Sequence, residues 1–188
     1  RLLKGVSGYN MNNCEMILAG FGGEGILFAG KILAYAAMLD GRHLSWLPSY
    51  GPEMRGGTAN CHVIISDEPI GSPIITKPDI LVAMNQPSLD KFENEVADGG
   101  AIFIDSSLIC RKSVRDDVKT FYVNATQIAD AMGRKNLANM VMLGTVLRET
   151  GLFSTDSIKR TIEKSLPPKR AELAVPNFEA VMAGYNYR

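Results

Sequence analysis

Apolar and polar positions follow a strand pattern in some segments and a helix pattern in others, and the two kinds of segment alternate along the chain. Short apolar runs are typical of buried strands, and longer runs with helical spacing are typical of helices. We expect strands at residues 15–19, 42–47, 58–66, 79–84, 101–105 and 121–123. We expect helices at residues 26–39, 87–96, 124–132, 137–148 and 155–165, with one more short helix in the tail. This alternation predicts an α/β fold, a mostly parallel, Rossmann-like sheet covered by helices on both faces.

The segment 42–73 departs from simple alternation, and we expect an irregular excursion of strand and loop there. Within it, residues 58–66 alternate, with Ala59 and Cys61 on one face and Asn60 and His62 on the other. Such a pattern predicts a half-buried strand, either at the margin of the sheet or in an antiparallel pair.

The predicted helix at residues 26–39 is apolar around most of its circumference, broken mainly by Lys31 and Tyr35. A helix of this kind is normally buried on most sides. One side meets the sheet in an α/β domain, so the other side needs a cover, for which another chain is a candidate.

Composition narrows the class of protein. The 188 residues are 46% hydrophobic and 21% charged, which fits one globular domain, and we assign residues 11–188 to it. The first ten residues precede Met11, and we expect a leader or a non-native extension there. Twenty basic and twenty acidic residues cancel, so no overall field gathers nucleic acid or an anionic membrane.

The three cysteines, Cys14, Cys61 and Cys110, lie far apart in the sequence. Their spacing supplies no disulfide framework, zinc site or iron–sulfur ligand set, so we expect no metal on this chain. Their number and spacing fit a reducing compartment, and we expect the cytoplasm. No run of 18 uncharged apolar residues is present, so we expect no membrane span.

A glycine-rich turn follows the first predicted strand, and its glycines are Gly20, Gly22, Gly23 and Gly25. The pattern GxGxxG between a strand and a helix lets backbone N–H groups approach a phosphate. A tight turn that packs closely explains the glycines equally well. A NAD site needs an acid after the second strand, where Trp46, Leu47 and Pro48 stand, and Glu24 adds a charge that repels pyrophosphate.

The second candidate site is the loop at residues 49–57, which Pro52 and the preceding Pro48 stiffen and three glycines fold. Arginine binds carboxylate or phosphate with two parallel hydrogen bonds, and Arg55 stands beside two glycines. Its candidate contact residues are Tyr50, Glu53, Arg55, Gly56 and Gly57. We expect the preceding strand to end at the same sheet edge as the glycine turn, so that both loops line one crevice. A solvated surface loop is the alternative.

The remaining polar residues give weaker evidence for a functional site. His62 lies on a strand without a partner nucleophile or acid at a fixed spacing, and His43 starts a strand, so we assign no catalytic residue. Asp105 leaves a strand at the edge where ligands collect, although it also suits a helix or turn cap. Asn124 with Gln127 resembles a capping pair that opens a helix.

Several motifs in order resemble the gamma subunit of 2-oxoacid:ferredoxin oxidoreductases. They are Ile17–Gly25, Ser49–Gly57 with the following Thr58-Ala59-Asn60-Cys61, the Ser66-Asp67 to Ser72-Pro73 turns, and Asn85-Gln86-Pro87-Ser88. The loop sequence Tyr-Gly-Pro-Glu-Met-Arg-Gly-Gly is more similar to that of the 2-oxoglutarate and branched-chain 2-oxoacid enzymes than to that of indolepyruvate enzymes. Glu24 departs from the glutamine of many members.

The resemblance implies a subunit that is inactive alone. The complete enzyme decarboxylates a 2-oxoacid on thiamine diphosphate, passes electrons through iron–sulfur clusters to ferredoxin, and releases an acyl-CoA. The implied partners are the alpha, beta and ferredoxin-like delta subunits, which hold those cofactors. Coenzyme A phosphates at the glycine turn or Arg55 are a hypothesis. The alternatives are a free-standing nucleotide- or acyl-CoA-binding module and an NAD(P)-dependent oxidoreductase.

Overall fold

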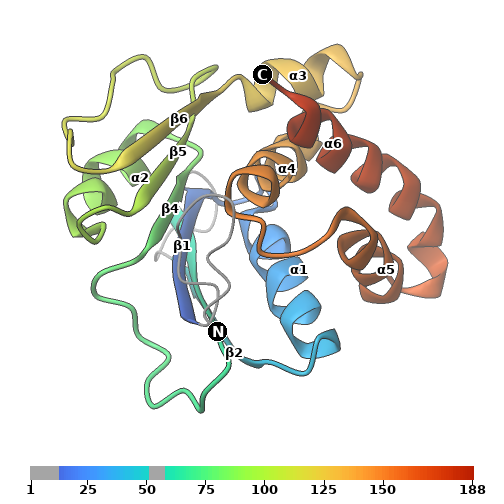
Figure 1. Ribbon diagram of the computed structural model, residues 1–188. Helices are drawn as coiled ribbons and strands as arrows, with labels where there is room; N and C mark the ends of the chain where they lie inside the picture. The colour runs from blue at the N-terminus through green and yellow to red at the C-terminus, as the bar shows by residue number, and fades with distance from the viewer. Residues whose placement is uncertain (1–12, 51–57) are drawn as a thin grey trace.

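The structure is a computed structural model that describes residues 13–50 and 58–188. The expected leader at residues 1–10 lies outside the described residues. Most of the candidate loop, residues 51–57, lies outside them too. Figure 1 shows one α/β body in which the sheet stands between a large group of helices and a single helix on its other side.

Six strands form the sheet in the order β2-β3-β1-β4-β5-β6. Their bounds are β1 Asn13–Phe21, β2 His43–Tyr50, β3 Thr58–Ser66, β4 Ile80–Ala83, β5 Ala101–Asp105 and β6 Lys119–Val123. Strands β1, β4, β5 and β6 run parallel, and β3 runs antiparallel to both of its neighbours, β1 and β2. Because β3 reverses the direction twice, β2 points the same way as β1.

The helices divide unequally between the two faces of the sheet. Their bounds are α1 Ile26–Leu39, α2 Gln86–Phe92, α3 Ala125–Ala131, α4 Ala138–Thr150, α5 Thr155–Ser165 and α6 Ala174–Asn186. Three short 3₁₀ helices are η1 Glu93–Glu95, η2 Lys135–Leu137 and η3 Pro168–Leu173. One core cluster joins the sheet to α1, α3, α4, α5 and α6, and a smaller one joins the opposite face to α2. The predicted α/β sheet with helices on both faces is confirmed (Figure 1).

The alternation of side chains explains the two cores. In β1, Met16 and Leu18 face the larger cluster, whereas Ile17 and Ala19 face α2. The short strands β4 and β5 are buried at every position, as their continuous apolar runs predict.

The expected irregular excursion at residues 42–73 is mostly regular structure. β2 continues to Tyr50, past the predicted end at Leu47, and pairs with β3 along its whole length. β3 is antiparallel as expected, but it is buried on both faces except at Thr58 and His62. The prediction of a half-buried strand is therefore wrong, because the second face packs against the α2 side of the core. Among the described residues of this segment, only Arg42 and residues 67–73 lie outside the two strands.

The chain itself covers the outer side of α1. This helix packs between the sheet and the C-terminal helices, and it contacts both α4 and α5. The expectation that another chain could cover it is corrected, since α5 supplies Ile158 and Ile162 to the same core. Only Met38 and Leu39, at the end of α1, stay exposed.

Helices α4 and α6 cross at two glycines. A Cβ atom on Gly184 would lie 1.7 Å from the carbonyl oxygen of Val141, and one on Gly144 would lie 1.9 Å from that of Val181. The Thr145 hydroxyl donates a hydrogen bond of 3.0 Å to the Gly184 carbonyl across the same crossing. Backbone therefore touches backbone here, and the tail forms a full 13-residue helix instead of the short one expected.

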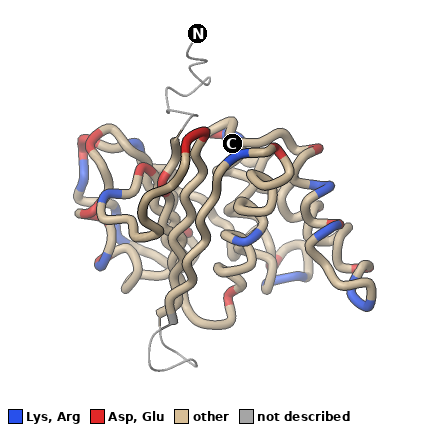
Figure 2. Tube along the Cα trace, turned by 90° about the horizontal axis from the view of Figure 1, so that it is seen from below, with Lys and Arg blue, Asp and Glu red and all other residues tan. Residues whose placement is uncertain are grey.

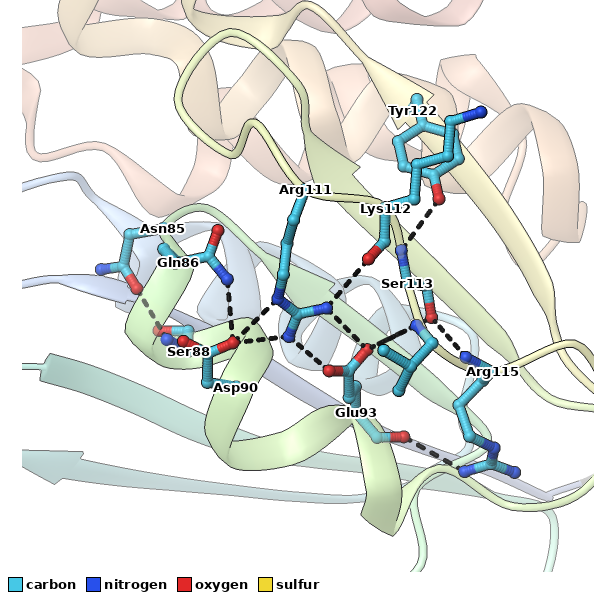
Figure 3. A network of polar contacts seen from close by, with 11 residues as sticks. Asn85, Gln86, Ser88, Asp90, Glu93, Arg111, Lys112, Ser113, Arg115 and Tyr122 are labelled. Atoms are coloured by element: carbon cyan, nitrogen blue, oxygen red, sulfur yellow. Dashed lines mark hydrogen bonds and ion pairs between the residues drawn. The ribbon is translucent and has the colours of Figure 1, made fainter.

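A polar network holds α2 and η1 to the connection between β5 and β6 (Figure 3). The Arg111 guanidinium bridges Asp90 on α2 and Glu93 on η1. Glu93 is only 3% exposed, and its carboxylate also accepts hydrogen bonds from Ser113 Oγ and the Val114 N–H, each at 3.3 Å. The pKa of the Arg111 guanidinium is raised, because Glu93 and then Asp90 stabilise its charged form.

Candidate functional site

The geometry of the sheet predicts where a ligand binds. The helix that follows β1 covers one face, and the helix that follows β4 covers the other. Since β1 and β4 are parallel neighbours, their connections part at their carboxyl ends and leave a crevice there. The glycine turn at residues 20–25 and the residues Met84 and Asn85 border this point.

Different local constraints explain why glycine stands at individual positions of the turn. Gly25 adopts a left-handed conformation, with a φ of 71°, and its carbonyl accepts the first hydrogen bonds of α1 from Phe28 and Ala29. No side chain caps this helix end. A Cβ on Gly20 would lie 2.6 Å from Glu24 Oε2 and 3.1 Å from Met84 Cβ, so a side chain there would displace the Glu24 carboxylate and crowd the residue after β4.

Glu24 turns its carboxylate back into the glycine turn. Its Oε2 accepts a hydrogen bond of 2.7 Å from the Phe21 N–H, and its own N–H donates to the Phe21 carbonyl at 3.2 Å. Burial raises the pKa of Glu24, the Phe21 hydrogen bond opposes that rise, and nearby Asp105 adds to it. An acid therefore occupies the inner side of the turn, which is the place where a phosphate would otherwise use the Phe21 N–H.

Two cavities open on either side of Gly23. The first, of about 350 Å³, has Glu24, Met84 and Leu108 among its lining residues, together with Lys135. The second, of about 480 Å³, lies between the start of α1 and the connection from α5 to α6. Its polar lining includes Lys31, Asn139 and Arg170. Because they share Gly23 and Asn136, the two cavities flank one wall, with Glu24 and Lys135 on one side and Lys31 and Arg170 on the other.

The expected meeting of two loops at one sheet edge is confirmed for the ends of their strands. Ala59 is the register partner of Gly20 on one side and of Tyr50 on the other. The end of β2 therefore lies at the same edge as the glycine turn. Glu53, Arg55, Gly56 and Gly57 lie outside the described residues, so their role as contact residues stays a prediction.

The strand order argues against the NAD arrangement. A NAD site uses an acid at the end of a parallel strand beside the glycine strand. Here β3 is antiparallel to β1 and starts at this edge with Thr58, and β4 ends at Ala83 before Met84 and Asn85. Among the residues that the structure describes, neither neighbour of β1 brings an acid to that position.

The other polar candidates have structural roles. His62 Nδ1 accepts a hydrogen bond of 3.0 Å from the Ile75 N–H, and burial lowers the pKa of its imidazole. Asp105 is fully buried and accepts from the Thr126 hydroxyl at 2.5 Å and from its N–H at 3.2 Å, which caps α3. Asn124 is the residue at which α3 opens, as expected, but its side chain does not cap the helix, since its Oδ1 accepts from Ser106 Oγ at 2.6 Å.

The sequence reasoning missed the residues that line the two cavities from the C-terminal half, namely Lys135, Asn136, Asn139, Ser165 and Arg170. Of these, Asn139 is the residue that the sequence could have indicated, because it is the one amide side chain in a mostly apolar helix. Its Nδ2 donates to the Gly25 carbonyl at 2.8 Å and so ties α4 to the glycine turn.

Over residues 13–50 and 58–188, no three His, Cys, Asp or Glu side chains gather closely enough to hold a metal ion. No helix in that part of the chain combines the length and the apolar character that crossing a bilayer requires.

Fold and crevice together define an α/β domain whose polar site lies at the switch point between two parallel strands. Residues 15–187 match the family described as pyruvate ferredoxin/flavodoxin oxidoreductase. The chain belongs to this family, which confirms the resemblance seen in its motifs.

Relatives carry names of subunits of such enzymes. The chain is 39% identical over 174 residues to the 2-oxoglutarate synthase subunit KorC of Methanocaldococcus jannaschii. This alignment covers 91% of this chain and 91% of KorC. It is 50% identical over 139 residues to the ketoisovalerate oxidoreductase subunit VorA of Methanothermobacter thermautotrophicus. That match covers 74% of this chain but 28% of VorA, so the chain spans less than a third of that relative.

Solved structures agree on the fold. The gamma subunit of a keto/oxoacid ferredoxin oxidoreductase from Geobacter sulfurreducens superposes with a TM-score of 0.76 and 32% identity, over 92% of this chain and 96% of that one. A 2-oxoglutarate:ferredoxin oxidoreductase from Magnetococcus marinus gives a TM-score of 0.84 over 93% of this chain and 30% of that one. Its identity of 23% supports the fold alone.

Proposed function

We propose that the chain is the gamma subunit of a multi-subunit 2-oxoacid:ferredoxin oxidoreductase and is inactive alone. Such an enzyme decarboxylates a 2-oxoacid oxidatively to an acyl-CoA and passes the electrons to ferredoxin. The observation that carries this proposal is similarity over the whole length. KorC and the Geobacter gamma subunit are each covered over more than nine tenths by a chain that is at least 30% identical to them.

The partners in this proposal are the alpha, beta and ferredoxin-like delta subunits of the same enzyme. They hold the thiamine diphosphate and the iron–sulfur clusters, which supply the decarboxylation and electron transfer when the complex is assembled. This chain contributes a rigid carboxyl edge, where the glycine turn and the loop at residues 49–57 approach a neighbouring subunit or coenzyme A.

Two substrate classes are supported, 2-oxoglutarate and a branched-chain 2-oxoacid such as 2-oxoisovalerate. The full-length similarity to KorC favours the first, and the higher identity to VorA within the shared segment favours the second. Substrate choice belongs to the subunits that bind the 2-oxoacid next to thiamine diphosphate.

Reconstitution tests the proposal. The neighbouring reading frames for the partner subunits are expressed with and without this chain, and coenzyme A-dependent reduction of ferredoxin is measured with 2-oxoglutarate and with 2-oxoisovalerate. We expect activity with one of the two acids only when this chain is present. Turnover of a 2-oxoacid, or reduction of a nicotinamide, by the purified chain alone would refute the proposal. Equal activity of the partners without it would refute it as well.

A further inference from the structure

Strand β6 forms one margin of the sheet, and its outer edge is open. Among the described residues, β6 pairs with β5 alone, in parallel register. The Lys119 N–H donates to the Gly100 carbonyl at 2.9 Å, so the backbone groups of Lys119 face β5. Because these groups alternate in direction along a strand, Thr120 and Tyr122 turn their N–H and C=O groups outward. The edge of β6 therefore offers backbone donors and acceptors to a further strand.

The two margins of the sheet differ in sequence. β2, at the other margin, contains Pro48, which lacks the N–H that strand pairing uses. β6 reads Lys-Thr-Phe-Tyr-Val, has no proline, and carries its single charge, Lys119, at one end. Proteins usually protect an exposed edge with proline, with charges or with a covering segment, because an unprotected edge pairs with other chains. The sequence of β6 therefore favours an edge that another chain pairs with.

A cavity of about 590 Å³ lies beside the same strand, and we call it the edge cavity. Phe121 of β6 lines it and stacks on Phe103, with the ring centroids 4.7 Å apart. Its other apolar lining residues are Leu147 on α4, Phe153 after that helix and Tyr185 on α6. Side chains alternate between the faces of a sheet, so a strand added beside β6 directs every second side chain toward the edge cavity.

The charge of the edge cavity complements an acidic segment. Its charged lining residues are Lys119, Arg148 and Glu149, two cations against one acid. Arg148 Nη2 lies 2.6 Å from Glu149 Oε1, so these two charges offset each other and an excess of one positive charge remains. Figure 2 shows further Lys and Arg segments over the helices on this side of the sheet. A guest that carries Asp or Glu is therefore favoured over a basic one.

We propose that an extended, acidic segment of a partner subunit adds as a strand to the outer edge of β6 and places one large apolar side chain in the edge cavity. Main-chain hydrogen bonds to Thr120 and Tyr122 give the affinity, and the cavity selects the side chain. This inference rests on the proposed function, which supplies the partner subunits. It concerns a separate place in the fold, because β4 and β5 lie between β6 and the strand that precedes the glycine turn.

Hydrogen–deuterium exchange tests the pairing, on the full chain alone and in the complex reconstituted with its partner subunits. In the free chain we expect fast exchange at the outward amides of Thr120 and Tyr122 and slower exchange at the inward amide of Phe121. In the complex, both outward amides should slow by about tenfold or more. A complex in which they stay fast overturns this inference and leaves the subunit assignment standing. If no complex forms, the proposed function is refuted and this inference with it.

Thr120→Pro removes one outward N–H and leaves the hydrogen bonds to β5 in place, since proline is tolerated where the N–H faces away from the sheet. Titration of the variant into the partner subunits should show binding about fivefold weaker or more. Thr120→Val is the matched control, because it keeps the N–H and removes a hydroxyl that has no hydrogen-bond partner in the described part of the chain. It should bind like the unmodified chain, and equal weakening in both variants overturns the inference.

Glu149→Gln tests the charge of the guest. It removes the acid of the edge cavity, so an acidic segment should bind about two- to fivefold more tightly. Weaker binding of this variant would indicate a basic guest and overturn the inference. Should Thr120→Pro fail to fold, which circular dichroism of the free variant shows, hydrogen–deuterium exchange of the unmodified chain still decides the pairing.

Discussion

At the scale of single residues, Glu24 shows that the GxGxxG pattern of the glycine turn does not by itself predict a phosphate site. The carboxylate takes the Phe21 N–H that a bound phosphate would use in a nucleotide site. The turn is thus satisfied from within, and its glycines serve close packing of Gly20 on Met84 and the left-handed backbone of Gly25. A matching GxGxxG can therefore follow a strand without making a dinucleotide site.

His62 carries a pH-dependent contribution to stability. Its Nδ1 must be unprotonated to accept the Ile75 N–H, and burial, followed by nearby Lys91, lowers the pKa of the folded imidazole. The unfolded state therefore takes up a proton first as the pH falls. The free energy of unfolding should decrease from about pH 6.5 downward until the folded imidazole is also protonated.

Chemical denaturation between pH 8 and pH 5 measures this. His62→Gln should lower the free energy of unfolding at pH 8 by about 1 kcal/mol, the usual worth of one hydrogen bond, and should flatten the pH dependence. His43→Gln is the control, since His43 is exposed on the edge strand, and it should keep the slope. A slope that survives in His62→Gln would contradict this assignment.

At the scale of elements, the α4–α6 crossing depends on two glycines. Gly184→Ala places a methyl group 1.7 Å from the Val141 carbonyl oxygen, so the helices must separate and the Thr145 hydrogen bond is strained. We expect a loss of about 3 kcal/mol in the free energy of unfolding, measured by urea titration. Gly71→Ala is the control, because a Cβ there meets nothing within 4 Å, and it should change stability little.

The ionic link between α2 and the β5–β6 connection is the second element-scale contact that a substitution can isolate. Arg111→Ala leaves the buried Glu93 carboxylate without its cation, which should cost about 3 kcal/mol in thermal or urea unfolding. Adding Glu93→Gln to that variant should restore part of the loss, because the unpaired charge is removed. Arg134→Ala breaks the exposed pair with Glu179 and should cost at most about 1 kcal/mol. Equal losses in the two arginine variants would argue against a special role for Glu93.

The strands and helices with strong periodicity could be predicted from the sequence. β3, β5 and α5 have the predicted bounds, because local patterning alone decides them. The length of β2 could not be predicted, since its last residues are polar or proline and are held by pairing with β3. A cap was one of the roles expected for Asp105, but the sequence could not show that α3 is the helix it caps, because α3 begins about twenty residues later. Nor could it show the residues that line the cavity beside the start of α1, which come from elements more than a hundred residues apart.

At the scale of the whole molecule, the proposed contact role of the loop at residues 49–57 can be tested in the assembled enzyme. Arg55→Ala should reduce coenzyme A-dependent activity of the reconstituted enzyme at least tenfold, or prevent its assembly, because arginine pairs with carboxylate or phosphate through two hydrogen bonds. Circular dichroism of the variant should match that of the unmodified chain. Arg160→Ala, on the exposed face of α5, is the control and should leave activity unchanged. Normal turnover by Arg55→Ala would remove the loop from the proposed site.

The register of β2 and β3 has a consequence for engineering. Because Tyr50 and Ala59 are partners across an antiparallel pair, the sheet clamps both ends of the intervening segment side by side. Because the β2–β3 pair holds both ends, the sequence between Tyr50 and Ala59 can be exchanged for its counterpart from a related enzyme while the strands keep their register. Chimeras made in this way would separate what the exchanged residues contribute to partner choice from what the rest of the subunit contributes.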